Sequence, residues 1–152
     1  MSIEPKPNFR SRKKYERKKR NMKTYSIGEV AIQFGLTIST IRYYDKEKLI
    51  PKLQKNSSGK RIFTLENIET IKMIECLKKA GMPIKDIKVF IQWCEAGDST
   101  IPNRLEMFRE LRQSVKEKLI DLEQTLDTLE YKCEYYSQAM IDGTEDYVRI
   151  KN

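Results

Sequence analysis

Short hydroxyl side chains, a guanidinium and a phenol gather within one stretch of seven residues. Side chains of these types hydrogen-bond to base edges and phosphates when a helix lies in the major groove of DNA. Generic helices seldom combine them. The candidate contacts in this stretch are Thr37, Ser39, Thr40, Arg42 and Tyr43. Their types and spacing predict a helix that reads nucleic acid.

A second cationic group follows a turn signal. Residues 56–59, with the sequence NSSG, separate the strand-like segments 52–55 and 60–63. The residue types of this turn favour a tight hairpin. Its second strand begins with Lys60 and Arg61, whose charges suit contact with phosphates beside a groove. We therefore predict a small wing that adds these two residues to the interface.

Two short helices are needed to position the first group. Apolar residues recur at helical spacing across 27–34, and Gly35 follows where a left-handed cap favours a residue without a Cβ. Thr37 supplies an oxygen for the N-cap of a second helix, whose apolar face includes Ile41 and Tyr44. Two helices joined this closely are typical of a helix-turn-helix.

The local charge distinguishes a DNA-binding helix pair from an ordinary small helical domain. Any small helical domain can contain such a helix pair, and Lys and Arg on a surface are mostly solvated. Residues 42–61, however, contain seven Lys or Arg against two acids. Phosphate neutralisation with counterion release requires clustered cations, so this excess favours DNA binding.

Four motifs within residues 25–63 resemble those of a known family. In chain order they are YSIGEVA, GLT, TIRYYDKEKLI and GKRIF. They resemble the N-terminal winged-helix domain of the MerR family of bacterial transcription regulators, and the similarity runs to about residue 92. The resemblance implies phosphate contacts for Tyr43 and Arg61, and packing within the domain for Tyr44. Arg42 would brace or contact the DNA.

Three positions depart from the family pattern. Ser39 stands where relatives often carry Arg or Lys, and Lys60 stands where an aromatic residue is common, so base preference cannot be transferred. Lys48 stands where the helix usually ends in glycine. A lysine in the left-handed conformation there costs about 1 kcal/mol. We expect Leu49 and Ile50 to compensate by packing.

The segment after the wing predicts two further helices and a linker. Thr64 is a suitable N-cap for a helix closed by Gly81, and a second helix follows Pro83. The composition of 95–103 predicts a linker. The winged helix-turn-helix domain would therefore cover residues 23–94.

A long helix with an apolar stripe is expected over residues 104–140. Apolar residues recur there at alternate spacings of three and four over five heptads, without Pro or Gly. The candidate dimerisation residues are Leu105, Phe108, Val115, Leu119, Leu122, Leu126, Leu129 and Tyr136. Such a stripe is typical of a two-chain coiled coil. The alternative, a helix folded back on its own domain, is weak because 64–92 is too short to cover five heptads.

The predicted fold class is mainly α: a winged helix-turn-helix domain, a long dimerisation helix and a tail over 141–152. The resemblance implies that the two helices of the coiled coil are antiparallel. Two identical readers related by a two-fold axis require a pseudo-palindromic site in double-stranded DNA. Dimers of the MerR family distort a promoter spacer so that RNA polymerase uses both promoter elements, and we expect activation of this kind. The alternative is an architectural coiled-coil protein that binds DNA with little sequence specificity.

The first 22 residues are strongly basic. Nine Lys or Arg stand against two acids in 1–21, so most of the net charge of +8 lies there. Such a segment is expected to be disordered when free. It would add contacts to the DNA backbone, or be a solvated leader, or precede a start of translation at Met22. It has no apolar region typical of a signal peptide, and no run of membrane-spanning length follows, so a cytoplasmic protein is predicted.

The cysteines indicate neither a disulfide framework nor a zinc site. Cys76, Cys94 and Cys133 are far apart, and the sequence contains no histidine. We expect each to be a small buried hydrophobe, with Cys94 and Cys133 as candidate thiol sensors. No catalytic residue, metal or cofactor is predicted, because no phosphate-binding glycine loop or nucleophile motif is present. Residues 141–152 are too few to enclose an effector, so the inducing signal is left open.

Overall fold

The computed structural model describes residues 23–150. The expectations for the basic segment 1–22 therefore concern residues outside the described part of the chain. The chain divides into two compact units, of which the first ends at Arg104 and the second begins at Leu105.

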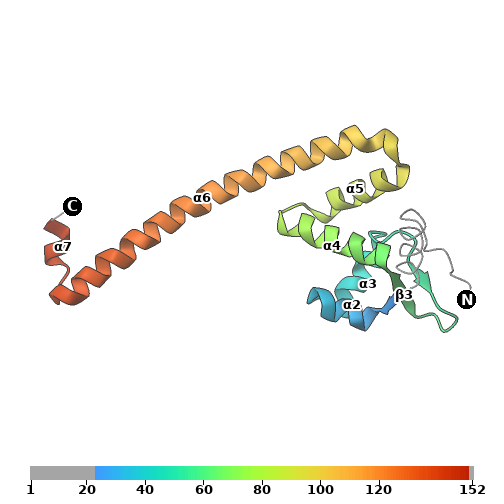
Figure 1. The fold of residues 1–152 in the computed structure, drawn as a ribbon, viewed down its shortest axis with the longest axis horizontal. Coiled ribbons are helices and arrows are strands. Elements are labelled where there is room, and N and C mark those ends of the chain that lie inside the picture. Colours follow the sequence, from blue (N-terminus) through green and yellow to red (C-terminus); the bar gives the residue numbers. More distant parts are fainter. Residues whose placement is uncertain (1–22, 151–152) are drawn as a thin grey trace, which may run out of the picture. The chain divides into compact units, whose positions relative to one another are not determined.

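A small sheet and four helices build the first unit (Figure 1). The strands are β1 (Thr24–Ser26), β2 (Gln54–Lys55) and β3 (Arg61–Thr64), and the helices are α2 (Ile27–Phe34), α3 (Ile38–Lys46), α4 (Leu65–Lys79) and α5 (Ile84–Ala96). Strand β3 is central, and β1 and β2 pair with it in antiparallel register. The predicted helix-turn-helix is α2 and α3, and the predicted wing is the hairpin of β2 and β3. These elements confirm the predicted fold class for this part of the chain.

Strand β1 was not predicted. It contains only three residues, and its pairing depends on a partner far along the chain, with Tyr25 opposite Phe63 and Ser26 opposite Ile62. Three residues are too few for an alternating pattern to be visible in a sequence. The pairing fixes the start of α2 against the wing.

Side-chain caps define the two helices of the helix-turn-helix. Ser26 and Glu29 form a capping box, in which the Ser26 N–H donates to Glu29 Oε2 at 2.7 Å and the Glu29 N–H donates to Ser26 Oγ at 3.3 Å. The Ser26 N–H and the Ser26 hydroxyl both donate to the Glu29 carboxylate, and these two hydrogen bonds hold the pKa of Glu29 below its usual value. Gly35 ends α2 at φ 63°. Thr37 then accepts the Thr40 N–H at 3.1 Å, as predicted for the N-cap of α3.

The turn after α3 bears out the expectation for Lys48, which lies at φ 58°. The Leu49 N–H donates to the Tyr44 carbonyl at 2.9 Å, and the Lys48 N–H donates to the Asp45 carbonyl at 3.0 Å. These are the two hydrogen bonds of a Schellman cap, here without its usual glycine. Leu49 and Ile50 are buried, as expected of residues that compensate the strain.

All four helices and β3 contribute to one apolar core. The residues with almost no exposed surface are Val30, Ile41, Tyr44, Leu49, Phe63, Ile71, Ile74, Leu77 and Ile87. Tyr44 is the largest of them and carries a polar group into this core. Its hydroxyl donates to Glu75 Oε1 at 2.6 Å and accepts from Lys78 Nζ at 2.5 Å. Burial, and then the hydrogen bond to Glu75, raise the pKa of Tyr44, so its hydroxyl stays neutral.

The predicted linker at 95–103 was too long. Helix α5 continues through Ala96, a single 3-10 turn covers Asp98–Thr100, and α6 (Ile101–Asp142) begins at once. Pro102 suggested a loop, but the N–H groups of a first helical turn have no acceptor within the helix, so proline is tolerated there.

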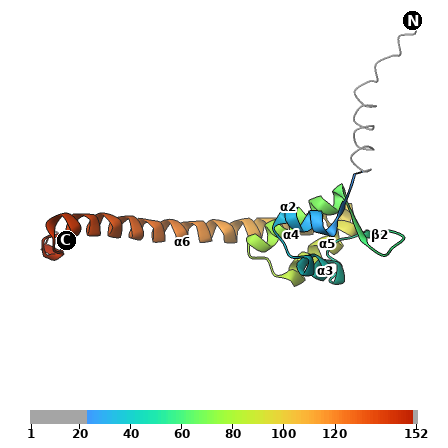
Figure 2. The ribbon, with the colours of Figure 1, turned by 90° about the horizontal axis from the view of Figure 1, so that it is seen from below.

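Helix α6 is a single helix of 42 residues, drawn without interruption in Figure 2. At 1.5 Å per residue it is about 63 Å long. Part of the predicted tail is also helical, since α6 ends at Asp142 and α7 covers Asp146–Ile150. Glu145 Oε2 accepts from the Tyr135 hydroxyl and from Arg149 Nη2, each at 3.2 Å. No helix within 23–150 is long and apolar enough to cross a membrane.

The expectation of buried cysteines was wrong. Cys76, Cys94 and Cys133 are all exposed. On α4 the buried face is formed by residues such as Ile74 and Leu77, and Cys76 lies beside this face rather than on it. Helical position decided their exposure, whereas residue type alone suggested burial.

Replacing Lys48 with glycine is expected to stabilise the first unit by up to about 1 kcal/mol, because glycine adopts a positive φ without strain. Thermal or urea unfolding measures the change. Lys72→Gly, in the exposed middle of α4, is the matched control and should lose about 1 kcal/mol. Equal destabilisation by both changes would contradict the account given for Lys48.

Tyr44→Phe is expected to lower the free energy of unfolding by about 1–2 kcal/mol at pH 7, because it removes two partly buried hydrogen bonds. The raised pKa gives this contribution a pH dependence. The contribution is complete below about pH 10, begins to fall above it and is lost as the pH rises through the folded-state pKa, so wild type and variant should start to converge above about pH 10. Urea unfolding from pH 7 to pH 11 measures the onset of this convergence. Tyr43→Phe, which changes an exposed ring, should leave the free energy of unfolding unchanged at every pH in this range.

Candidate nucleic-acid interface

Helix α3 presents one buried face and one exposed face. Ile41 and Tyr44 are buried, whereas Ser39, Arg42 and Tyr43 are exposed. This division follows from a helical period of 3.6 residues applied to a helix that packs on one side only. The three exposed side chains are therefore free of the core and available to a ligand, as the sequence predicted.

The two predicted threonines play a more local part. The hydroxyls of Thr37 and Thr40 lie 2.8 Å apart and hydrogen-bond to each other, and Thr37 also caps the helix. A hydroxyl has one donor and two acceptor positions, so each retains some capacity for an outside partner. Their first role in the structure is to fix the N-terminus of α3, where the exposed face begins.

The tip of the wing is organised by one amide oxygen. Asn56 Oδ1 accepts from the Ser58 N–H at 3.1 Å, the Ser58 hydroxyl at 2.8 Å and the Lys60 N–H at 2.9 Å. The Asn56 N–H also donates to the Lys60 carbonyl at 2.8 Å. The sequence indicated the turn but not this role of Asn56. The exposed Lys60 is consequently placed at a fully hydrogen-bonded turn.

An ion pair connects the wing to α3. Arg61 Nε donates to Asp45 Oδ2 at 2.7 Å, and each side chain is 26% exposed. A guanidinium has five N–H donors, so this contact through Nε leaves donors for a phosphate. From the sequence, Asp45 is one of two acids within a basic segment, and its pairing with Arg61 was not predicted. In the structure it orients Arg61, and it brings the two predicted groups of cations together.

Two lysines of α4 and α5 form contacts within the domain. Lys78 is hydrogen-bonded to Tyr44, and Lys88 Nζ lies 3.6 Å from Glu47 Oε2. The first contact joins α4 to α3, and the second joins α5 to the residue that follows α3. These two ammonium groups therefore also hold the domain together, whereas Lys72, Lys79 and Lys85 on the same two helices are exposed.

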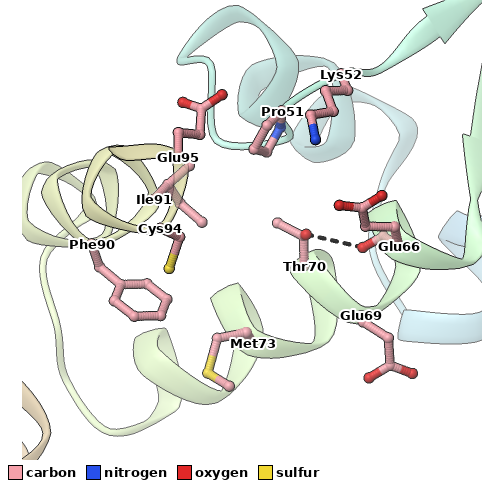
Figure 3. Close-up of a pocket in the computed structure, with 10 residues that line it drawn as sticks. All are labelled: Pro51, Lys52, Glu66, Glu69, Thr70, Met73, Phe90, Ile91, Cys94 and Glu95. Atoms are coloured by element: carbon pink, nitrogen blue, oxygen red, sulfur yellow. Dashed lines mark hydrogen bonds between the residues drawn. The ribbon is translucent and has the colours of Figure 1, made fainter. Parts of the chain in front are cut away.

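A pocket of about 490 Å³ opens between α4, α5 and the loop before β2 (Figure 3). Its lining residues are Pro51, Lys52, Glu66, Glu69, Thr70, Met73, Phe90, Ile91, Cys94 and Glu95. Figure 3 shows the Cys94 sulfur directed into the space between the two helices. Three carboxylates against one ammonium disfavour a phosphate ligand here. This surface is therefore distinct in charge from the exposed face of α3 and the wing.

No cluster of His, Cys, Asp and Glu suited to a metal ion is found among residues 23–150. Cys94 lies in the first unit and Cys133 in the second, and both thiols are exposed. Thiol sensing by either residue stays a prediction.

Known proteins are similar to this chain over most of its length. Residues 25–92 match the model of the MerR HTH family regulatory proteins. An uncharacterised HTH-type transcriptional regulator of Haemophilus influenzae is 36% identical over 127 residues, which cover 84% of this chain and 94% of the relative. The chain belongs to the MerR family. Its relatives are transcription regulators rather than enzymes.

Solved structures of MerR family regulators extend the similarity beyond the first unit. HiNmlR, a MerR family regulator lacking the sensor domain and bound to promoter DNA, superposes with a TM-score of 0.78 at 36% identity, covering 83% of this chain and 96% of HiNmlR. A MerR family regulator from Bacillus thuringiensis is 46% identical, with a TM-score of 0.67, covering 74% of this chain and 98% of that one. The predicted family and fold class are thereby confirmed for this MerR protein.

Arg61→Gln should weaken binding to DNA about tenfold, because a charge-assisted hydrogen bond to a phosphate contributes about 1.5 kcal/mol or more. The slope of log K against log salt should also fall by about one. Titrations of a bound fragment at several salt concentrations measure both. Arg149→Gln, which removes the same charge from α7, is the matched control. An unchanged slope for Arg61→Gln would remove this residue from the interface.

Proposed function

We propose that this MerR protein is a homodimeric, sequence-specific transcription regulator that binds a pseudo-palindromic promoter site. In this proposal α3 enters the major groove through Ser39, Thr40, Arg42 and Tyr43. The wing residues Lys60 and Arg61 contact phosphates beside it. The observation that carries the proposal is the Arg61–Asp45 ion pair, which joins the wing to α3 as one cationic surface.

The exposed stripe of α6 supports dimerisation. Leu119, Leu122 and Leu129 are each more than half exposed in the single chain, and Leu122 reaches 64%. A continuous apolar stripe of this length marks an interaction surface on a helix. A second copy of the same helix would bury it, and would thereby relate two DNA-binding units by a two-fold axis.

Promoter activation is the finer part of the proposal. HiNmlR was solved on promoter DNA, and the family resemblance implies distortion of the promoter spacer so that RNA polymerase engages both promoter elements. Bending and untwisting of a site cost a few kcal/mol, which contacts from two units on one duplex would supply. The inducing signal is not part of the proposal.

Recovery and sequencing of genomic fragments bound by the purified protein at near-physiological salt test the proposal. We expect discrete pseudo-palindromic sites within promoter spacers, with bending of the recovered fragments in an electrophoretic assay. Leu122→Arg should give monomers that bind these sites at least about 100-fold more weakly, because two-unit avidity is lost.

Thr128→Arg is the matched control, since it adds the same charge on the opposite side of α6 and should leave dimer and binding unchanged. A Leu122→Arg protein that remained dimeric and bound normally would overturn the proposed dimer interface. Diffuse recovery of fragments with a steep salt dependence would instead support an architectural DNA-binding protein.

A further inference from the structure

The pocket between α4, α5 and the loop before β2 has no part in the proposed function. Its volume of about 490 Å³ lies within the range of small-molecule sites in proteins. All of its lining residues belong to the first unit, and they come from three separate elements (Figure 3). The pocket is therefore a candidate site for a ligand other than DNA.

One wall of this pocket is apolar. Phe90 and Ile91 of α5 are buried members of the core, whereas Met73 of α4 is 38% exposed. Small-molecule sites are lined mostly by apolar and aromatic side chains, with a few polar groups that orient the ligand. A ligand with an apolar body would lie against Phe90 and would remove the Met73 side chain from water.

The rim of the pocket is acidic. Glu66 and Glu69 of α4 and Glu95 of α5 stand against the single ammonium of Lys52, so three negative charges and one positive charge give a net formal charge of −2. In Figure 3 Glu66 and Glu95 lie on opposite sides of the space, whereas the Glu69 carboxylate is directed away from it. Glu66 and Glu95 are therefore the acids placed to meet a ligand.

These carboxylates are also unpaired within the described part of the chain. Among residues 23–150, Glu66, Glu69 and Glu95 form no ion pair, although Asp45, Glu47 and Glu75 of the same unit each pair with a cation. An exposed carboxylate is ordinarily solvated, so its charge alone would not indicate a ligand. Here two of them flank a cavity with an apolar wall, where attraction to a bound cation is stronger than in open water.

Charge and apolar surface together select one class of ligand. The rim repels an anion. A small hydrated cation gains nothing from the apolar wall, and the described residues, 23–150, contain no group of three side chains suited to a metal ion. A cation that carries an apolar body satisfies both the rim and the wall.

We propose that this pocket binds an organic cation, a protonated amine on an apolar body. Glu66 and Glu95 hold the ammonium group, and the body lies against Phe90 and Met73. The Cys94 sulfur, which is directed into the same space in Figure 3, lies beside the bound ligand. The site uses no residue of α3 or the wing, so the inference goes beyond the proposed function and does not depend on it.

Cys94 provides a direct test, because it is exposed and lines the pocket. In a full-length chain carrying Cys76→Ser and Cys133→Ser, 4-phenylbutylammonium should slow the alkylation of Cys94 by iodoacetamide at neutral pH. The rate should fall as 1 + [L]/Kd, which is about tenfold at about ten times Kd. The matched control is the chain with Cys133 alone, carrying Cys76→Ser and Cys94→Ser, whose alkylation rate should not change.

Two further probes separate the charge from the apolar body. The first is 4-phenylbutanoate, which has a similar body and the opposite charge, and the second is butylammonium, which has the charge without the ring. Each should require at least about tenfold higher concentration for the same protection of Cys94, because the first loses the charge-assisted hydrogen bonds and the second loses the apolar contact.

Charge removal tests the assignment of the rim. Glu66→Gln with Glu95→Gln should raise the Kd of 4-phenylbutylammonium at least about tenfold and should not raise that of 4-phenylbutanoate. Glu110→Gln with Glu123→Gln, which removes the same two charges from α6, should change neither constant. Glutamine and glutamate have similar helix propensities, so both variants should remain folded.

Each contrary outcome overturns a stated part of the inference. Equal protection by 4-phenylbutylammonium and 4-phenylbutanoate overturns the proposed ligand class. No protection by 4-phenylbutylammonium at millimolar concentration, or equal slowing at Cys133, overturns the site. An unchanged Kd in the Glu66 and Glu95 variant overturns the role of the rim. None of these measurements involves DNA, so their failure and a failure of the proposed function are distinguishable.

Discussion

The burial of Tyr44 is the constraint on which the DNA-binding unit depends. Its ring occupies the core between α3 and α4, and its hydroxyl is satisfied by Glu75 and Lys78 at short distances. An unsatisfied hydroxyl at this depth would cost about 1–3 kcal/mol. Because burial of the tyrosine without these partners would carry that cost, Glu75 and Lys78 favour one rotation of α3 about its own axis. That rotation decides that Ser39, Arg42 and Tyr43 face outward.

The interface therefore arises from packing as much as from charge. Lys78 of α4 and Lys88 of α5 bond to Tyr44 and Glu47 and so help to hold the helices together. Arg61 serves both purposes, since one edge of its guanidinium is held by Asp45 and the rest is free of that contact. Electrostatic attraction to DNA is long-ranged, but its placement on the surface is set by contacts shorter than 4 Å.

Features with a local cause could be predicted from the sequence, and features with a distant cause could not. The caps at Thr37 and Thr64, the stop at Gly35 and the strained Lys48 each depend on a few neighbouring residues, and each was predicted. The predicted residues of α3 and the wing lie on one domain, although their contacts with DNA remain a prediction. Partners distant in sequence were missed, including Asp45 for Arg61, Glu75 for Tyr44 and Phe63 for Tyr25. The cysteines were misplaced because burial on a helix follows position around its axis, and the neighbouring core residues carry that information more reliably than the thiol does.

The wing tip at Asn56 has a thermodynamic consequence for binding. A surface hairpin that ordered only on contact would lose about 1–2 kcal/mol of backbone entropy for each residue it fixed. Here three donors converge on Asn56 Oδ1, and the Asn56 N–H closes the same turn, so every one of these bonds lies within a single chain. The conformational entropy of residues 56–60 is therefore lost during folding. Binding to DNA does not have to order these residues again, so this cost does not reduce the free energy of binding. Asn56 can thus raise affinity without itself contacting the DNA.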